Sequence, residues 1–226
     1  MTPLPRIVDP QAIPVAGIDD HLPPVAPELL VPPALRERFV KPPAWEPEIP
    51  GDGRRFFPDR VPKAASVLVP LVMRDDGLRV LLTRRTDHLR DHAGQISFPG
   101  GRVEPGDADA LATALREAEE EIGLARALVT PIGRLDTYVT RTGFEVTPVV
   151  GLVAPPPSLA PDPFEVAEVF EVPLAFILDP ASRQRHSRLY AGKTRYFHVF
   201  PWRDYYIWGA TAGMLVNLAD LLGDSP

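Results

Sequence analysis

The sequence contains no cysteine among its 226 residues. Disulfides, zinc–thiolate sites and cysteine nucleophiles are therefore excluded. No uninterrupted apolar run reaches the roughly 18 residues of a membrane-spanning helix, so none is expected. The N-terminal residues Met1–Arg6 lack the apolar segment of a signal peptide, and the last three residues are not a peroxisomal signal. These absences leave the cytoplasm as the expected location.

Clusters of basic residues are also lacking. The net charge is −6, and no run of Lys or Arg exceeds two residues. A surface of this kind repels nucleic acid, so we expect neither a nucleic-acid nor a membrane partner. A small anionic substrate would have to be held by local arginines and bound cations. The sequence leaves open whether the protein is a monomer or a homodimer.

Proline is abundant but unevenly distributed, with 15 of the 29 prolines in residues 1–62. Because proline lacks a backbone donor and has a fixed φ, this region should be extended or polyproline-like, with a short helix near Pro33–Phe39. We predict an N-terminal arm over residues 1–60 that wraps on a single domain over residues 61–224. A partly disordered tail over residues 1–25 is the alternative. The hydrophobic content of 45% suffices for one medium-sized core.

Beyond the arm, the pattern predicts an α/β fold. Two apolar runs, Ala64–Met73 and Leu78–Thr83, flank an Asp-Asp-Gly turn and indicate a β-hairpin. A helix is expected over Asp109–Ile122, with Asp109 as its N-cap and Gly123 just past its end. Further strands are expected over Pro131–Tyr138, Phe144–Leu152, Val166–Val172, Arg195–Phe200 and Tyr205–Trp208, and helices over Leu174–Leu178 and Ala210–Leu222. This order predicts a mixed sheet between helices.

The central helix carries an acidic face. At 100° per residue its apolar positions form one stripe, which consists of Leu111, Leu115, Ala118 and Ile122. Glu117, Glu120 and Glu121 lie together on a different face and repel one another. Arg116 lies one turn before Glu120 and can brace it.

Clustered carboxylates are what a hard divalent cation such as Mg²⁺ or Mn²⁺ requires. We therefore expect Glu117, Glu120 and Glu121 to hold the metal, with the backbone carbonyl of Gly101 in the tight Gly100–Gly101 turn as a further ligand. Bound metal can polarise a phosphoryl oxygen and lower the pKa of an attacking water. The alternative is an ordinary solvated acidic face.

The joint pattern resembles a known family. Gly101 is followed six residues on by the acid Asp107, and then by Arg-Glu-Ala-Glu-Glu-Glu-Ile-Gly-Leu over Arg116–Leu124. This closely resembles the Nudix box, G-x5-E-x7-R-E-U-x-E-E-x-G-U, where U is aliphatic. Asp107 departs from it by replacing Glu and by lying one residue further from the arginine. The resemblance implies a Nudix-type α/β/α sandwich and a hydrolase.

The segment upstream is similar to one branch of that family. Leu81–Thr86, Arg90, Gly94 and Phe98–Gly101 resemble the coenzyme A diphosphatase signature L-L-T-x-R-[SA]-x3-R-x3-G-x3-F-P-G-G, with Thr86 as the single mismatch. The resemblance spans about residues 64–222. It implies cleavage of coenzyme A or its thioesters into 4′-phosphopantetheine, or its acyl form, and adenosine 3′,5′-bisphosphate. Another Nudix diphosphatase, for ADP-ribose or a dinucleotide, and a non-catalytic Nudix-like ligand sensor are the alternatives.

The resemblance also carries candidate roles. Arg84, Arg85 and Arg90 are expected to bind substrate phosphates, and Arg116 belongs to the catalytic set. The general base stays open, because Glu120, Glu168 and Glu165 each offer a carboxylate. His186 and His198 are less expected as bases, His88 and His92 flank Arg90, and Tyr138, Phe144 and Trp208 are aromatic candidates for stacking adenine.

Overall fold

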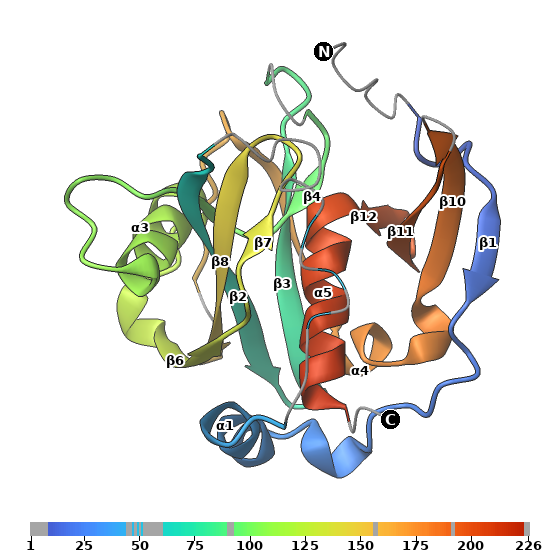
Figure 1. Ribbon diagram of the computed structural model, residues 1–226. Helices are drawn as coiled ribbons and strands as arrows, with labels where there is room; N and C mark the ends of the chain where they lie inside the picture. Colours follow the sequence, from blue (N-terminus) through green and yellow to red (C-terminus); the bar gives the residue numbers. More distant parts are fainter. Residues whose placement is uncertain are drawn as a thin grey trace.

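Two β-sheets and a long helix between them organise the chain (Figure 1). The computed structural model describes residues 9–43, 47, 49, 51, 61–89, 93–155, 158–190 and 193–223. Within these residues no helix is both long and apolar enough to span a membrane.

The larger sheet has eight strands and grows from the predicted hairpin of β2 (Lys63–Arg74) and β3 (Gly77–Arg85). Gly77 has φ 117°, a conformation that favours glycine in the turn. β2 also pairs in parallel with β8 (Phe144–Val153) along ten residues. The other strands are β4 (Ile96–Ser97), β5 (Gly100–Arg102), β6 (Val129–Arg134), β7 (Tyr138–Val139) and β9 (Val166–Pro173). The mixed sheet is the predicted one.

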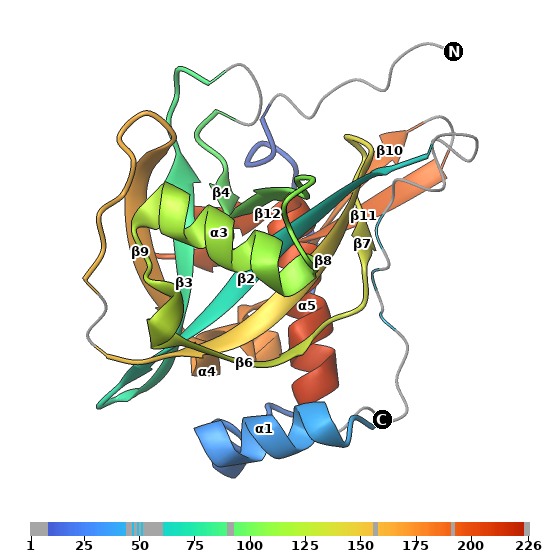
Figure 2. The ribbon, with the colours of Figure 1, turned by 90° about the vertical axis from the view of Figure 1, so that its left-hand side faces the viewer.

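Helices cover both faces of this sheet, which confirms the expected layers. On one face, α3 (Ala110–Ile122) packs on a core that includes Leu68 and Leu81 (Figure 2). On the other, α5 (Gly209–Leu222) packs on a second core that includes Val69 and Leu82. Consecutive residues of one strand, such as Leu68 and Val69, thus enter different cores, because side chains alternate between the two faces of a strand.

Local signals set the limits of α3. The Asp109 side chain accepts a hydrogen bond from the Ala112 N–H at 2.8 Å, and Gly123 has φ 65°. The predicted stripe needs adjustment, because only Ala118 and Ile122 are fully buried, whereas Leu111 and Leu115 are half-covered. Ala114, one turn before Ala118, is also fully buried. The helix therefore approaches the sheet closely, through small side chains.

The second sheet is antiparallel and takes one strand from the arm. Its order is β1 (Val15–Ile18), β10 (Gln184–Tyr190), β11 (Lys193–Trp202) and β12 (Tyr205–Trp208). β10 was not predicted, because its polar sequence shows no regular alternation of apolar residues. α5 lies between the two sheets and is buried on nearly all sides.

Further residues of the N-terminal arm pack against the C-terminal end of α5. In α1 (Pro32–Val40), Leu35 is fully buried and Phe39 covers Gly133. The Arg38 guanidinium donates to the carbonyl groups of Leu221 at 3.0 Å, Leu222 and Gly223. It thereby satisfies carbonyls that the end of a helix leaves open. The remaining short elements are η1 (Pro27–Leu29), η2 (Arg126–Leu128), α4 (Leu174–Ile177) and η3 (Pro180–Ser182).

The strand predicted over Pro131–Tyr138 is wrong as a single element. β6 ends at Arg134 and β7 begins at Tyr138, and both pair with β8. The register of β6 against β8 shifts between Pro131 and Gly133. Pro131 has no N–H to donate to the ladder, so regular pairing is interrupted here.

Candidate metal and diphosphate site

Glu121 lies at the base of the acidic face and is only 7% exposed. Its Oε2 accepts the Gly100 N–H at 3.1 Å, and its Oε1 lies 3.7 Å from Nη1 of Arg85. Burial raises the pKa of Glu121 to about 7, although the Gly100 N–H and Arg85 oppose this shift. A carboxylate in this position is costly to ionise without a nearby cation.

The Gly100–Gly101 pair lets the helix carboxylates approach the backbone. Gly100 has φ 154°, and a Cβ there would lie 2.4 Å from the Ser66 carbonyl oxygen. A Cβ on Gly101 would lie 2.4 Å from Oε1 of Glu117. Any larger residue would therefore displace the β2 backbone or the carboxylate.

Arg116 joins the separate carboxylates of the helix. Its Nη1 lies 3.1 Å from Oε1 of Glu117 and 2.9 Å from Oε2 of Glu120. Its Nη2 donates to the Arg102 carbonyl at 3.1 Å. Hydrogen bonds and charge from the carboxylates raise the pKa of Arg116, Asp107 contributing most. The predicted brace of Glu120 is thus present and extends to Glu117.

Asp107 anchors this arginine, a role that its departure from the box hid. Its Oδ1 accepts Nε of Arg116 and its Oδ2 accepts Nη2, both at 3.0 Å. Oδ2 also accepts the Glu104 N–H and the Thr113 hydroxyl, each at 2.9 Å. These donors, Arg116 first, hold the pKa of Asp107 well below its usual range. Asp107 therefore positions Arg116, and the buried Thr113 within the first turn of α3 was the sequence signal for it.

Glu165 adds a further acid to the cluster. The Thr86 N–H donates to the Glu165 carbonyl at 3.0 Å, and the Thr86 hydroxyl donates to the Phe164 carbonyl at 2.8 Å. The charge of Glu165 raises the pKa of both Glu117 and Glu121, for which burial is the larger cause. The threonine that departs from the branch signature thus uses its hydroxyl to fix the loop that carries Glu165.

The donor set fits a hard divalent cation. Among the described residues, four carboxylates pair with two guanidinium groups: Asp107, Glu117 and Glu120 with Arg116, and Glu121 with Arg85. The charge of a fifth acid, Glu165, also acts on Glu117 and Glu121. In the described part of the chain no three acidic or histidine side chains converge as a complete metal cage. Mg²⁺ seldom uses such a cage, because it keeps several waters and also binds substrate phosphates.

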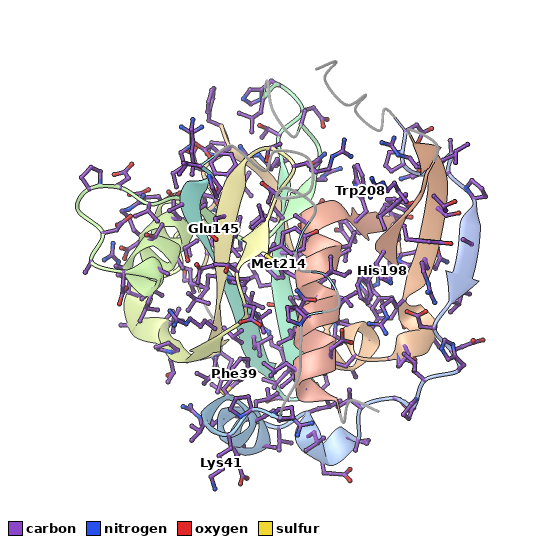
Figure 3. The ribbon with its side chains drawn as sticks, viewed as in Figure 1. Phe39, Lys41, Glu145, His198, Trp208 and Met214 are labelled. Carbon is purple, nitrogen blue, oxygen red and sulfur yellow. The ribbon has the colours of Figure 1, made fainter. Side chains whose placement is uncertain are left out.

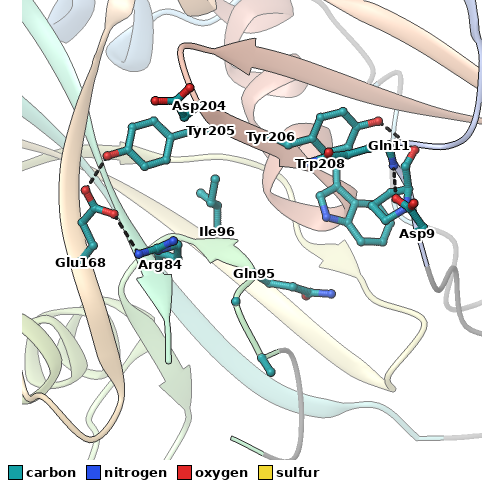
Figure 4. Close-up of a pocket in the computed structure, with 13 residues that line it drawn as sticks. Asp9, Gln11, Arg84, Gln95, Ile96, Glu168, Asp204, Tyr205, Tyr206 and Trp208 are labelled. Atoms are coloured by element: carbon teal, nitrogen blue, oxygen red, sulfur yellow. Dashed lines mark hydrogen bonds and ion pairs between the residues drawn. The ribbon is translucent and has the colours of Figure 1, made fainter. Parts of the chain in front are cut away.

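The structure separates the two neighbouring arginines of β3. Arg85 points to Glu121, whereas Arg84 faces a pocket on the other side of the sheet. There, Oε2 of Glu168 lies 3.4 Å from Nη2 of Arg84, and Oε1 accepts the Tyr205 hydroxyl at 2.5 Å (Figure 4). Glu168 is thereby set apart from the acidic face of α3. Arg90 lies outside the described residues.

The remaining candidates lie mostly away from the acidic face. Figure 3 shows His198 on the second sheet, across α5 from α3. His186 is on the same sheet, with its Nδ1 2.8 Å from the Ile13 carbonyl oxygen. His88 contacts the Phe164 ring at 4.8 Å, and His92 is outside the described residues. Of the aromatic candidates, Tyr138 is buried, Phe144 lies 5.2 Å below the Arg102 guanidinium, and Trp208 lines the pocket of Glu168.

The amino-acid sequence is similar to those of known proteins. The NUDIX domain model matches residues 62–192. Nudix hydrolase 15, mitochondrial, of Arabidopsis thaliana is 41% identical over 75% of this chain, which spans 62% of that relative's length. The Nudix hydrolase NudL of Escherichia coli K12 is 42% identical over 73% of this chain and 85% of its own. An Ap4A hydrolase from C. elegans, solved as a binary complex, is similar at 21% identity and a TM-score of 0.43, over 49% of this chain and 80% of its own.

Proposed function

This chain belongs to the Nudix domain family, and from that premise we propose that it hydrolyses the diphosphate of coenzyme A or its thioesters. The products are 4′-phosphopantetheine, or its acyl form, and adenosine 3′,5′-bisphosphate. One observation carries the proposal: a glycine pair brings the carboxylates of Glu117 and Glu121 against the backbone, at the end of the segment that resembles the coenzyme A signature.

Glu117, Glu120 and Glu121, with the Gly101 carbonyl, would hold Mg²⁺ or Mn²⁺. When bound, the metal polarises a phosphoryl oxygen and lowers the pKa of a water molecule. Arg116 keeps Glu117 and Glu120 close together, and Asp107 keeps Arg116 in place. The residues of the chain thereby form a preorganised anionic site.

Arg85 is the arginine best placed for the diphosphate. Its guanidinium faces Glu121, so a phosphate that enters the acidic cluster meets this cation. A guanidinium binds phosphate oxygens in pairs, which also orients the group. Arg84 is directed to the other face, and we assign it no contact with the reacting diphosphate. Arg90 is retained as a phosphate ligand on the resemblance alone.

The identity of the general base is tested by comparing variants of two acids on one segment, Glu165 and Glu168. The charge of Glu165 acts on the pKa of Glu121, whereas Glu168 faces the pocket. Steady-state kinetics of Glu165→Gln and Glu168→Gln should therefore differ, the first lowering kcat and the second raising KM. The opposite result would return Glu168 to the role of base. Loss of kcat only in Glu120→Gln would instead assign it to Glu120, whose side chain is 59% exposed.

The proposed reaction is tested by a substrate panel. The protein is incubated with coenzyme A, ADP-ribose and a dinucleotide, with and without Mg²⁺, and the products are identified. We expect metal-dependent release of adenosine 3′,5′-bisphosphate from coenzyme A at the highest kcat/KM. Preference for ADP-ribose or the dinucleotide would retain the diphosphatase and replace its substrate. Binding without cleavage of any compound would indicate a ligand sensor.

A further inference from the structure

A pocket of about 540 Å³ lies on the face of the large sheet opposite α3 (Figure 4). Its walls come from the ends of β3 and β4, from β9, from β12 and from arm residues 9–11. The segment that lines it, Gly94–Ile96, leads along the chain to the Gly100–Gly101 turn. Three residues lie between Ile96 and Gly100, so the two are at most about 13 Å apart along an extended chain. One elongated ligand can therefore reach both the pocket and the diphosphate site.

The walls of the pocket are fixed by their own contacts. The Tyr205 ring stacks on Phe170 at 3.7 Å, and its hydroxyl donates to Glu168. The Tyr206 hydroxyl donates to the Pro10 carbonyl at 3.0 Å, which holds the arm against β12. Asp9 accepts the Gln11 N–H at 3.0 Å. These contacts hold the walls in place, so binding needs little reorganisation.

The charge of the lining excludes a phosphate. Three acids, Asp9, Glu168 and Asp204, face one arginine, Arg84, and that arginine is already paired with Glu168. The 3′-phosphoadenosine end of coenzyme A is anionic and would be repelled. The pantetheine end carries no charge, and it has two amide groups for hydrogen bonds and an apolar part that can contact aromatic rings.

We propose that this pocket binds the pantetheine arm of the substrate, with Glu168, Tyr206 and Trp208 as the residues that determine specificity. The assignment rests on the proposed function. In this assignment the N-terminal arm contributes to substrate binding, because Asp9 and Pro10 form one wall of the pocket. It also separates the roles of the two neighbouring arginines, Arg85 beside the diphosphate and Arg84 beside the uncharged arm.

Pantetheine itself is the probe, because it has neither phosphate nor diphosphate. The full-length protein is titrated with pantetheine in the presence of a chelator, and tryptophan emission is followed. Trp208 lines the pocket, whereas Trp202 lies outside it against Phe176 at 4.6 Å. A saturable change in emission should be lost in Trp208→Phe and kept in the matched Trp202→Phe. No saturable change in the wild type, or an unchanged signal in Trp208→Phe, would overturn the assignment.

Two further measurements keep the test independent of that variant. Glu168→Gln should weaken pantetheine binding by about 5- to 10-fold and leave adenosine 3′,5′-bisphosphate binding unchanged. Pantothenate, which ends in a carboxylate, should bind more weakly than pantetheine, and Asp204→Asn should narrow the difference. Equal binding of the two compounds by the wild type would contradict the electrostatic argument.

The outcomes also distinguish this inference from the proposed reaction. If pantetheine binds at Trp208 but coenzyme A is not cleaved, the pocket assignment stands and the proposed reaction fails. If coenzyme A is cleaved while Glu168→Gln and Trp208→Phe leave its KM unchanged, the reaction stands and the pocket assignment fails.

Discussion

Two ionic clusters in the described part of the chain differ in their balance of charge. One surrounds Asp19 of the arm, which is 4% exposed and lies 2.8 Å from Nε of Arg183 and 2.6 Å from Nη2 of Arg185. Arg183 also lies 3.3 Å from Asp220. The other surrounds Glu121 on α3, where four carboxylates share the two described arginines Arg85 and Arg116.

The difference in charge balance distinguishes a cluster that stabilises the fold from one that is suited to bind a cation. In the Asp19 cluster the two carboxylates meet two guanidinium groups, so no further cation is needed and the arm is fixed to β10 and α5. In the α3 cluster the carboxylates outnumber the described arginines, so the excess negative charges repel one another. A bound cation would balance them, which is the reason to regard this cluster as the reactive one.

The largest expected effect comes from breaking the balanced cluster. Asp19→Ala removes the nearer of the two carboxylates that pair with the buried guanidinium of Arg183 and should lower the free energy of unfolding by about 3–5 kcal/mol. Chemical denaturation followed by circular dichroism measures this. The matched control is Asp20→Ala, next to it and exposed, with a change within about 0.5 kcal/mol. Equal effects of the two variants would mean that the cluster contributes no stability.

Breaking the unbalanced cluster should affect activity instead. Glu121→Gln keeps the shape of the side chain but removes one charge from the proposed metal site, so kcat should fall at least about 100-fold while the fold is retained. Turnover and circular dichroism are measured together. Glu119→Gln is the control, because Glu119 pairs with Arg126 on another face of α3. Near-normal turnover of Glu121→Gln at saturating Mg²⁺ would remove Glu121 from the metal site.

The effect of added metal on thermal stability should also differ between variants of the two clusters. A ligand that binds only the native state stabilises it by mass action, by about 2.7 kcal/mol at a hundredfold excess over Kd. Millimolar Mg²⁺ or Mn²⁺ should therefore raise the Tm of the wild type. The rise should be lost in Glu121→Gln and kept in Asp19→Asn, despite the lower starting Tm. A wild type without any shift would favour a solvated acidic face.

The smallest effect is a pH dependence within the balanced cluster. Burial raises the pKa of Asp220 even though Arg183 opposes the shift. The folded state therefore binds its proton more tightly than the unfolded state, so stability falls as pH rises from about 3.8 through the raised value. Asp220→Asn should reduce this fall in a denaturation series across that range. An unchanged slope would show that Asp220 ionises as freely in the folded protein as in the unfolded chain.

Sequence reasoning worked best where the signal is local. The limits of α3 follow from the Asp109 cap and from Gly123 in the left-handed region, both readable from neighbouring residues. The β2–β3 hairpin follows from two apolar runs around a turn. Such features depend on backbone geometry within a few residues, and that geometry is nearly the same in any protein.

The sequence was less informative where distant segments meet. Asp107, which departs from the Nudix box in residue type and spacing, was given no role in the predicted site, yet it holds Arg116 with two hydrogen bonds. Glu165 and Glu168 were equivalent candidates until the pairing of β9 with β3 was known. In that pairing the register shifts between Arg84 and Arg85, so the alternation of side chains along β9 is interrupted. An extra residue of this kind leaves no mark in the sequence.

The sequence by itself determined the mixed α/β class, the acidic helix, the glycine turn beside it and the family to which the chain belongs. Each of these depends on residue type and short spacing. Only the tertiary structure decided that Arg85 meets Glu121 while Arg84 meets Glu168, that Asp19 of the arm is a buried anchor, and that arm residues 9–11 close a pocket. These outcomes depend on which strands pair and in which register, and the free energy that selects them is spread over contacts between residues far apart in the chain.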